Sequence, residues 1–245
     1  MKSVDINCDL GEEKGNDAEI IPFISSANIA CGYHAGNPEV MEHTVELALQ
    51  HGVAIGAHPG YPDREHFGRV SMDMTGEETV KLVMDQIILL KEITDRKNAV
   101  LHHVKLHGAL YIETYRSYEF SKMIFKAIKK EYPGLMVYVA YNSMAEYTCR
   151  ELGIPYKKEA FSDRMYNQDG SIVPRINKGA VIEDKDQVVR RSVQMIKSNR
   201  IRAYNGKYLN ILFDTLCIHG DNANALEIAR EIHSILKAEN IEIRF

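Results

Sequence analysis

The sequence predicts an α/β protein, an irregular (β/α)7-type barrel that occupies residues 1–245 as a single domain. Short runs of Val, Ile, Leu and Tyr recur along the chain. They are continuous rather than alternating, as in parallel strands that are covered on both faces. Amphipathic segments separate these runs, and 245 residues is a length at which a barrel often forms one domain. An open, doubly wound sheet is the alternative architecture.

Seven apolar segments have the length and composition of strands. They cover residues 3–8, 27–31, 53–57, 99–104, 135–140, 155–160 and 213–218. Residues 241–245 fit an eighth, shorter strand. Because the strands alternate with helical segments from one end of the chain to the other, they indicate repeated βα units and a parallel sheet.

Helix start signals lie between these strands. Asn37 is an N-cap residue before Pro38, which suits the first helical position, and Thr75 forms a capping box with Glu78. These and similar signals predict helices at 37–51, 75–96, 117–131, 143–152, 184–199 and 222–239. Three long irregular stretches remain, at 58–74, 161–179 and 204–212, and loops of this length are often functional.

Charged and imidazole side chains follow almost every predicted strand at its carboxyl end. In a barrel these ends form one rim, where active sites lie. Lys105 and His107 are two residues apart, as are His219 and Asp221, so each pair points to one side of an extended chain. An imidazole beside a charged group has the tuned pKa that general acid–base catalysis needs. The candidate catalytic residues are Asp9, Glu12, Lys105, His107, Asp163, His219 and Asp221.

Asp9, His34 and His58 follow three successive predicted strands. One carboxylate and two imidazoles can bind a divalent metal and leave positions open. No sequential metal motif such as HExxH accompanies them, and histidines in barrels also hydrogen-bond to carboxylates. We therefore treat these three residues as candidate metal ligands, with plain hydrogen bonding as the alternative.

Composition limits the classes of partner. Lys and Arg number 30 and Asp and Glu 34, a net charge of −4 without a basic run, so nucleic acid is not an expected partner. No apolar window long enough to span a membrane occurs. The polar start does not resemble a signal peptide, and four cysteines lack CxxC spacing, so we expect a cytoplasmic protein. Neither a Walker A motif nor GxGxxG is present, so the residues alone do not identify a nucleotide.

Long motifs along nearly the whole chain closely resemble the LamB/YcsF family. They are NCDLGE at 7–12, SANIACGYHAGNP at 26–38, GVAIGAHPGYPD at 52–63, FGR at 67–69, HVKLHGALY at 103–111, FSDRMY at 161–166 and DTLCIHGD at 214–221. The resemblance implies a distorted seven-stranded barrel similar to glycoside hydrolase and deacetylase domains. It also implies a role as the A component of a 5-oxoprolinase, which opens 5-oxo-L-proline (pyroglutamate) to L-glutamate with ATP and two further subunits, B and C.

The implied chemistry suggests roles for the motif residues. ATP with Mg²⁺ would be the cosubstrate, because a five-membered lactam re-forms easily and its opening benefits from coupling. Lys105, Arg69 and Arg164 could stabilise phosphoryl charge, and Asp9 could help to hold Mg²⁺. His107 or His219 could move protons.

Two other functions fit the same residues. A metal-dependent deacetylase or amidohydrolase would use Asp9, His34 and His58 and need no ATP. A noncatalytic protein of the complex would hold oxoproline or dock the B and C partners. The number of acids and bases at the strand ends argues against the noncatalytic function, because binding a small anion needs few of them.

Overall fold

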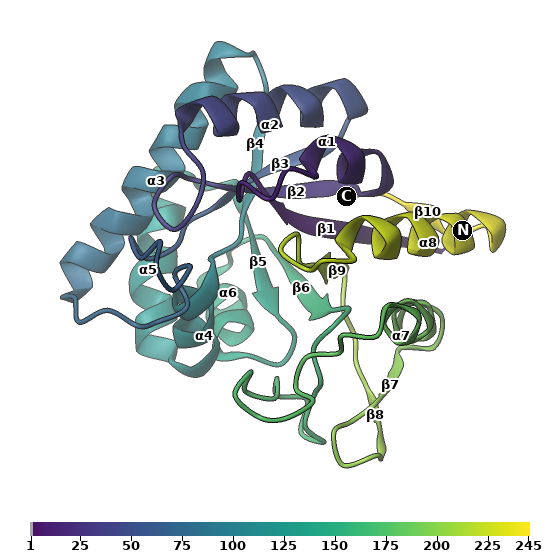
Figure 1. Ribbon diagram of the computed structural model, residues 1–245. Coiled ribbons are helices and arrows are strands. Elements are labelled where there is room, and N and C mark those ends of the chain that lie inside the picture. The colour runs from purple at the N-terminus through teal and green to yellow at the C-terminus, as the bar shows by residue number, and fades with distance from the viewer. Residues whose placement is uncertain (1) are drawn as a thin grey trace.

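The computed structural model describes residues 2–245 and contains a closed barrel of parallel strands (Figure 1). In barrel order, these are β1 (Ser3–Leu10), β2 (Ser26–Ala30), β3 (Ala54–His58), β4 (Leu101–Val104), β5 (Met136–Ala140), β6 (Tyr156–Phe161) and β9 (Thr215–Ile218). β1 pairs with β2 on one side and with β9 on the other, which closes the ring. The predicted barrel is confirmed, and the open sheet is excluded.

A short strand, β10 (Glu242–Ile243), pairs with the first residues of β1 outside the ring. Ser3 lies opposite Glu242, whereas the later residues of β1 pair with β2 and β9. The predicted eighth strand therefore exists, but it extends the start of β1 and is not a barrel stave.

The predicted helices form, and each predicted boundary lies within three residues of the observed one. They are α2 (Pro38–His51), α3 (Gly76–Arg96), α5 (Tyr118–Glu131), α6 (Met144–Leu152), α7 (Lys185–Ser198) and α8 (Ala225–Ala238). The capping signals act as expected. Asn37 accepts a hydrogen bond from the Val40 N–H, and Thr75 and Glu78 form the reciprocal capping box. The apolar faces of the helices pack against the outside of the barrel.

Five elements were not predicted. A short helix, α1 (Asp17–Ile20), and a 3₁₀ turn, η1 (Ile21–Phe23), lie between β1 and β2, and α4 (Gly108–Arg116) directly follows the fourth predicted strand. Part of the predicted loop at 204–212 is instead a strand, β8 (Tyr208–Asn210), which pairs antiparallel with β7 (Arg200–Arg202). Three-residue strands give too little periodicity for recognition, so only the pairing reveals this hairpin.

The inside of the barrel is filled by polar and aromatic side chains rather than by an apolar core. His103 of β4 hydrogen-bonds to Asn28 at 2.8 Å, and its ring stacks on Tyr138 of β5 with centroids 4.0 Å apart. Gly56 of β3 makes room for this imidazole, because a Cβ there would lie 2.1 Å from Nε2 of His103. This layer supports the polar groups at the carboxyl ends of the strands.

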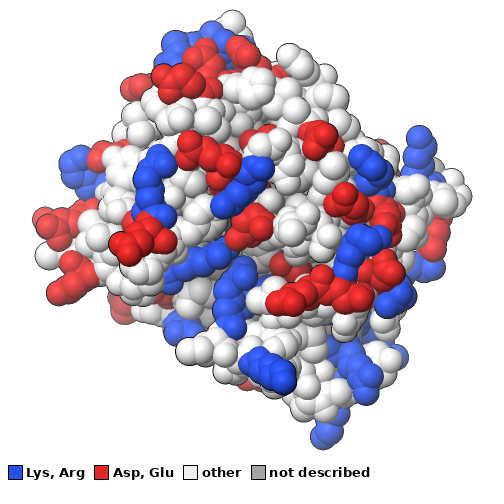
Figure 2. Space-filling view, in the orientation of Figure 1, with Lys and Arg blue, Asp and Glu red and all other residues white. Residues whose placement is uncertain are grey.

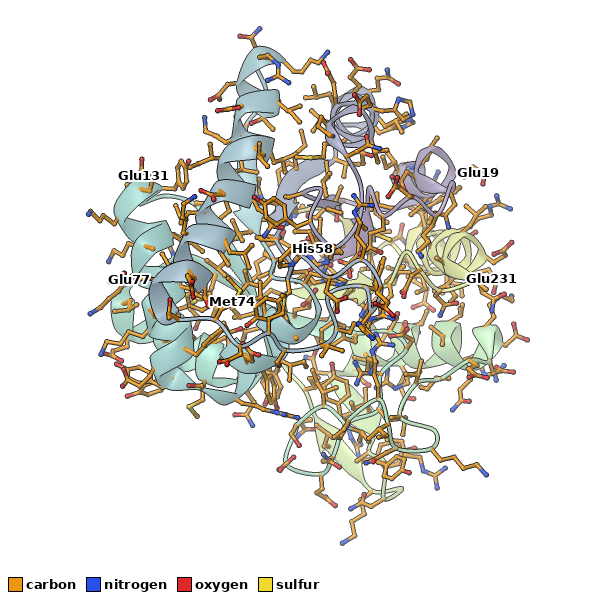
Figure 3. The ribbon with its side chains drawn as sticks, turned by 60° about the vertical axis from the view of Figure 1, so that its left-hand side comes forward. Glu19, His58, Met74, Glu77, Glu131 and Glu231 are labelled. Atoms are coloured by element: carbon orange, nitrogen blue, oxygen red, sulfur yellow. The ribbon has the colours of Figure 1, made fainter. Side chains whose placement is uncertain are left out.

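Acidic and basic side chains are interleaved over the face of the molecule in Figure 2. Along residues 2–245, every helix is too short or too polar to cross a bilayer. In Figure 3, His58 lies near the centre of the molecule, whereas Glu19, Glu131 and Glu231 lie at its periphery.

Candidate active site

A cavity of about 360 Å³ opens at the carboxyl ends of the barrel strands. Nine of the residues singled out from the sequence line it: Asp9, Glu12, His58, Arg69, Lys105, His107, Arg164, His219 and Asp221. They come from the ends of β1, β3, β4, β6 and β9 and from the loops that follow. Asp163 and His34 lie immediately behind the wall, where they contact His219 and Glu12 respectively.

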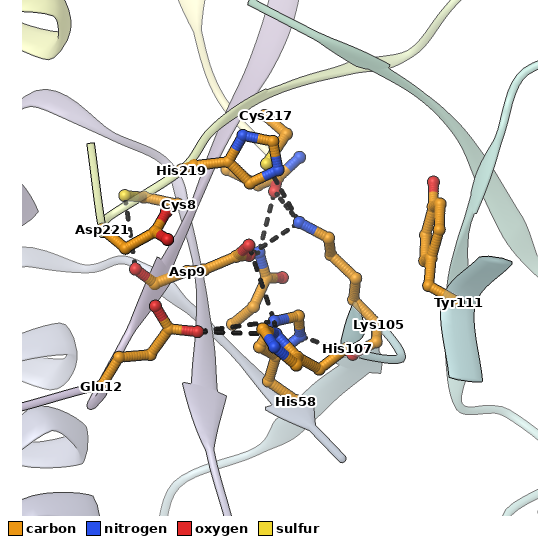
Figure 4. Close-up of polar contacts among 12 residues, drawn as sticks. Cys8, Asp9, Glu12, His58, Lys105, His107, Tyr111, Cys217, His219 and Asp221 are labelled. Carbon is orange, nitrogen blue, oxygen red and sulfur yellow. Dashed lines mark hydrogen bonds and ion pairs between the residues drawn. The ribbon is translucent and has the colours of Figure 1, made fainter. Parts of the chain in front are cut away.

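Lys105 is the central cation of the cavity floor, and only 2% of its surface is exposed. Its Nζ lies 2.6 Å from Oδ1 of Asp9 and 3.0 Å from Oε1 of Glu159 (Figure 4). Burial opposes the charge on Lys105, but Asp9 outweighs burial and keeps the pKa of Lys105 well above its usual value. The ammonium group is therefore a fixed positive charge beneath the cavity.

Asp9 is held as an anion by its neighbours. Oδ1 accepts hydrogen bonds from Lys105 and from Nδ2 of Asn28 at 2.8 Å, and Oδ2 lies 3.5 Å from Nε2 of His58. Burial alone would raise the pKa of Asp9, but interaction with His58 and Lys105 holds it well below the usual value. An anion and a cation are thus fixed side by side on the floor.

A second buried group lies beside this ion pair and is named here the Glu–His cluster: Glu12, His34, His58 and His107. Oε1 of Glu12 lies 3.5 Å from Nε2 of His34, 4.0 Å from Nε2 of His58 and 3.6 Å from Nδ1 of His107. Burial raises the pKa of Glu12 well above its usual value and lowers the pKa values of His34 and His107 well below theirs. This donor set could bind a metal ion.

The structure changes the candidate metal set. His34 and His58 lie together, but their carboxylate neighbour in the cluster is Glu12 rather than Asp9, and His107 is the fourth member. Asp9 is instead drawn toward Lys105 and Asn28, which use one of its oxygens. The sequence could not show this, because Asp9 and Glu12 follow the same strand.

The Asp163–His219 pair forms one side of the cavity. Nδ1 of His219 lies 2.8 Å from Oδ1 of Asp163, and the imidazole stacks on Phe161 with centroids 5.3 Å apart. Burial works against ionisation of Asp163, but His219 outweighs it and lowers the pKa of Asp163 to about 2. Asp163 therefore orients the ring of His219 toward the cavity without lining the cavity itself.

Three arginines surround the mouth of the cavity. Arg69 pairs with Asp221 at 2.5 Å, and Arg164 donates to the backbone oxygen of Val173 at 2.7 Å. Burial and the nearby Arg175 lower the pKa of Arg164 to about 10. Such a concentration of guanidinium groups suits a carboxylate or phosphate.

Sequence reasoning missed three residues of the site: Arg175, Glu159 and Tyr111. Arg175 lies in the long loop at 161–179, where nothing in the local sequence distinguishes it from a solvated arginine. Glu159 follows two lysines in β6, a pattern typical of an exposed strand, yet it is fully buried and accepts a hydrogen bond from Tyr111 at 2.6 Å. The alternation along β6 was the one available signal, since it points Glu159 inward.

The fold and the site define a parallel (β/α) barrel with a polar, charged pocket at the carboxyl ends of its strands. The model of the LamB/YcsF family matches residues 4–245. The chain belongs to the LamB/YcsF family.

Curated relatives are named for one enzyme, as the A component of 5-oxoprolinase. The relative so named from Natranaerobius thermophilus is 43% identical over 249 residues, covering 100% of this chain and 97% of the relative. A protein of the same name from Pyrococcus abyssi is 42% identical, covering 98% of this chain and 96% of the relative.

Solved structures agree with the fold. The lactam utilization protein of Thermus thermophilus is 40% identical and superposes with a TM-score of 0.93, covering 100% of this chain and 99% of that chain. The peptidoglycan deacetylase PdaC of Bacillus subtilis superposes with a TM-score of 0.54 at 10% identity, covering 99% of this chain and 87% of that chain. The second likeness concerns the barrel fold alone.

Proposed function

We propose that this chain is the A component of an ATP-dependent 5-oxoprolinase, which converts 5-oxo-L-proline to L-glutamate while ATP is hydrolysed to ADP and phosphate. The observation that carries the proposal is the combination, in one pocket, of the buried Lys105–Asp9 ion pair with arginines at the mouth. The names of relatives more than 40% identical over the whole chain support the same reaction.

The substrate matches the charges of the cavity. Oxoproline carries a carboxylate, which the guanidinium groups of Arg69, Arg164 and Arg175 can bind. Its lactam oxygen becomes more negative as the carbonyl is attacked, and the fixed ammonium of Lys105 can stabilise that charge. His219, oriented by Asp163, and His107 are positioned to accept or donate protons at the ring nitrogen and the attacking water.

ATP supplies the driving force in this proposal. Transfer of the γ-phosphoryl group to the lactam oxygen releases ADP and activates the carbonyl carbon. Addition of water then breaks the ring C–N bond, and the nitrogen leaves as the amine of a glutamyl phosphate. A second water releases phosphate and L-glutamate. Mg²⁺ would accompany the nucleotide, with the free Oδ2 of Asp9 as a candidate ligand and Arg69 and Arg164 toward the phosphates.

The partners proposed are 5-oxoprolinase subunits B and C. We expect no glutamate from the purified chain alone, but ATP-dependent glutamate formation when B, C and Mg²⁺ are added. The measurement is glutamate and ADP release from oxoproline in the four combinations of partners and ATP. Efficient turnover by the chain alone without ATP would reject the coupled reaction, and full ATP-dependent turnover without partners would reject the need for B and C.

A substitution at Asp9 tests the role of the pocket. Asp9→Asn should lower turnover in the reconstituted enzyme by at least about 100-fold, because the fixed anion beside Lys105 and His58 is lost. His43→Gln, on the exposed face of α2, is the matched control and should leave turnover unchanged. Near-normal turnover of Asp9→Asn would remove Asp9 from the site and favour a noncatalytic, oxoproline-binding role.

A second candidate function is a metal-dependent amidohydrolase or deacetylase that needs no ATP. The observation in its favour is the buried Glu–His cluster, which lies within the same cavity floor as Lys105. A bound cation would supply Lewis-acid polarisation of an amide carbonyl or an activated water. ATP-independent hydrolysis that is abolished by a chelator would favour this function over the first.

We also propose that the protein acts in the cytoplasm. All four cysteines are free thiols buried in the fold, as expected in a reducing compartment.

A further inference from the structure

The lone pairs of the Glu–His cluster converge without matching donors. Nδ1 of His58 lies 2.7 Å from the backbone oxygen of Lys105, and Nε2 of His107 lies 2.8 Å from the backbone oxygen of Phe67. A carbonyl oxygen only accepts hydrogen bonds, so each of these two nitrogens carries the ring proton in a neutral imidazole. The opposite nitrogens of His58 and His107 then present bare lone pairs.

Those two bare nitrogens face each other. Nε2 of His58 and Nδ1 of His107 lie 2.9 Å apart, and Oε1 of Glu12 points toward both rings (Figure 4). Two facing lone pairs repel unless a proton or a metal ion lies between them or beside them. A single shared proton would satisfy the two rings but would leave the carboxylate oxygen of Glu12 without a donor.

Three further atoms indicate that the cluster lacks a partner. Oε1 of Glu12 and both ring nitrogens of His34 are buried without a hydrogen bond, although both residues are more than nine-tenths buried. Leaving buried polar atoms unsatisfied costs about 1–3 kcal/mol each, so such atoms call for an explanation. Nε2 of His34 lies 3.5 Å from Oε1 of Glu12, which places its lone pair at the same point as the others.

The backbone is shaped to hold His34 in this position. A Cβ at Gly60 would lie 2.4 Å from Nδ1 of His34, and a Cβ at Gly68 would lie 3.0 Å from the Cβ of His34 and 3.1 Å from Cδ2 of His107. Gly68 also has φ +62, a conformation that side chains disfavour. The rings of His34 and His107 stack with centroids 3.8 Å apart, so the two glycines admit both rings to the cluster.

We propose that Glu12, His34, His58 and His107 bind one divalent transition-metal cation of the zinc class at the floor of the cavity. Three imidazole nitrogens and one carboxylate oxygen suit Zn²⁺, Co²⁺ or Fe²⁺, whereas Mg²⁺ prefers a shell of oxygens. The backbone carbonyls behind His58 and His107 fix the tautomers, as outer hydrogen-bond partners do in metal sites. This cation would be distinct from the Mg²⁺ that accompanies ATP, and the inference does not depend on the proposed reaction.

The test uses metal binding rather than turnover. The full chain is freed of metal with a chelator, and Co²⁺ is then titrated while its visible absorption and the bound metal per chain are measured. We expect one equivalent to bind with the absorption of a low-coordinate site, Zn²⁺ to displace it and Mg²⁺ not to. Failure of the wild-type chain to bind Co²⁺ or Zn²⁺ at one equivalent would overturn the proposal and indicate a shared proton instead.

Four variants identify the ligands. Glu12→Gln and His34→Gln should each weaken binding by at least about 100-fold, more than the loss of an outer partner. Asp9→Asn should weaken it by less than about tenfold, and His43→Gln, an exposed histidine on α2, should not change it. Urea unfolding of each metal-free variant checks that the fold is intact, and Glu12→Gln decides the matter if His34→Gln does not fold.

Other outcomes contradict the assignment. Equal affinity of Glu12→Gln and the wild type would remove Glu12 and overturn the proposed ligand set. Loss of binding in Asp9→Asn with retention in Glu12→Gln would replace it with Asp9, His34 and His58. Because no substrate is present, either result leaves the ATP-dependent reaction to be judged separately by glutamate formation.

Discussion

The ammonium group of Lys105 lies between the carboxylates of Asp9 and Glu159, so it supports the fold as well as the proposed chemistry. Lys105→Met would leave two buried carboxylates without their cation. We expect the free energy of unfolding to fall by about 3–5 kcal/mol, as when one partner of a buried ion pair is removed. Urea unfolding at pH 7 measures the change.

A double variant separates charge from packing at the same position. Lys105→Met combined with Asp9→Asn removes one of the stranded charges, so it should be more stable than Lys105→Met alone. The outcome against this account is additive destabilisation by the two substitutions, which would show that Asp9 and Lys105 do not depend on each other.

The ionisation of Asp163 makes stability depend on pH. The pKa of Asp163 in the folded protein is about 2, below its usual value of 3.8, because His219 outweighs the effect of burial. The pair therefore contributes about 2 kcal/mol above pH 4, and this contribution is lost as the pH falls toward 2.

The Asp163→Asn variant isolates that contribution. Urea unfolding should show the variant less stable than the wild type by about 2 kcal/mol at pH 5, with the difference shrinking at pH 3. A difference that stays constant between these pH values would mean that Asp163 acts through shape or hydrogen bonding rather than charge.

At the scale of elements, β3 and β4 depend on one missing side chain. Gly56→Ala would place a Cβ 2.1 Å from Nε2 of His103, and that ring is fixed by Asn28 and Tyr138. We expect the variant to lose about 1–3 kcal/mol of stability through overpacking. Thermal unfolding compares it with Gly134→Ala, where a Cβ would contact nothing within 4 Å and stability should change by less than about 0.5 kcal/mol.

For the whole molecule, the sequence was sufficient to predict the barrel because its signals are repetitive. Continuous apolar runs mark buried parallel strands, and residues such as Asn37 and Thr75 mark helix starts wherever a side chain caps the first turn. The hairpin of β7 and β8 lacks both signals. It is stabilised by pairing between residues such as Ile201 and Leu209, which no local pattern reveals.

The location of the pocket was predictable, but its internal pairing was not. Strand ends of a barrel must meet at one rim, so Asp9, Lys105 and His219 had to lie near one another. Which carboxylate faces which base depends on the direction of each side chain within a few ångströms. That is why Glu12 rather than Asp9 lies among the imidazoles.

Closure of the ring by β1 and β9 also fixes when the pocket can form during synthesis. Asp5 pairs with Thr215, a separation of most of the chain, so β1 stays an open edge until β9 leaves the ribosome. A fragment of residues 1–212 should consequently lack a cooperative urea transition and bind hydrophobic dyes, whereas the full chain should unfold in one step. The nascent protein must then be guarded against aggregation until its last quarter is translated, and the proposed site is among the final parts of the molecule to mature.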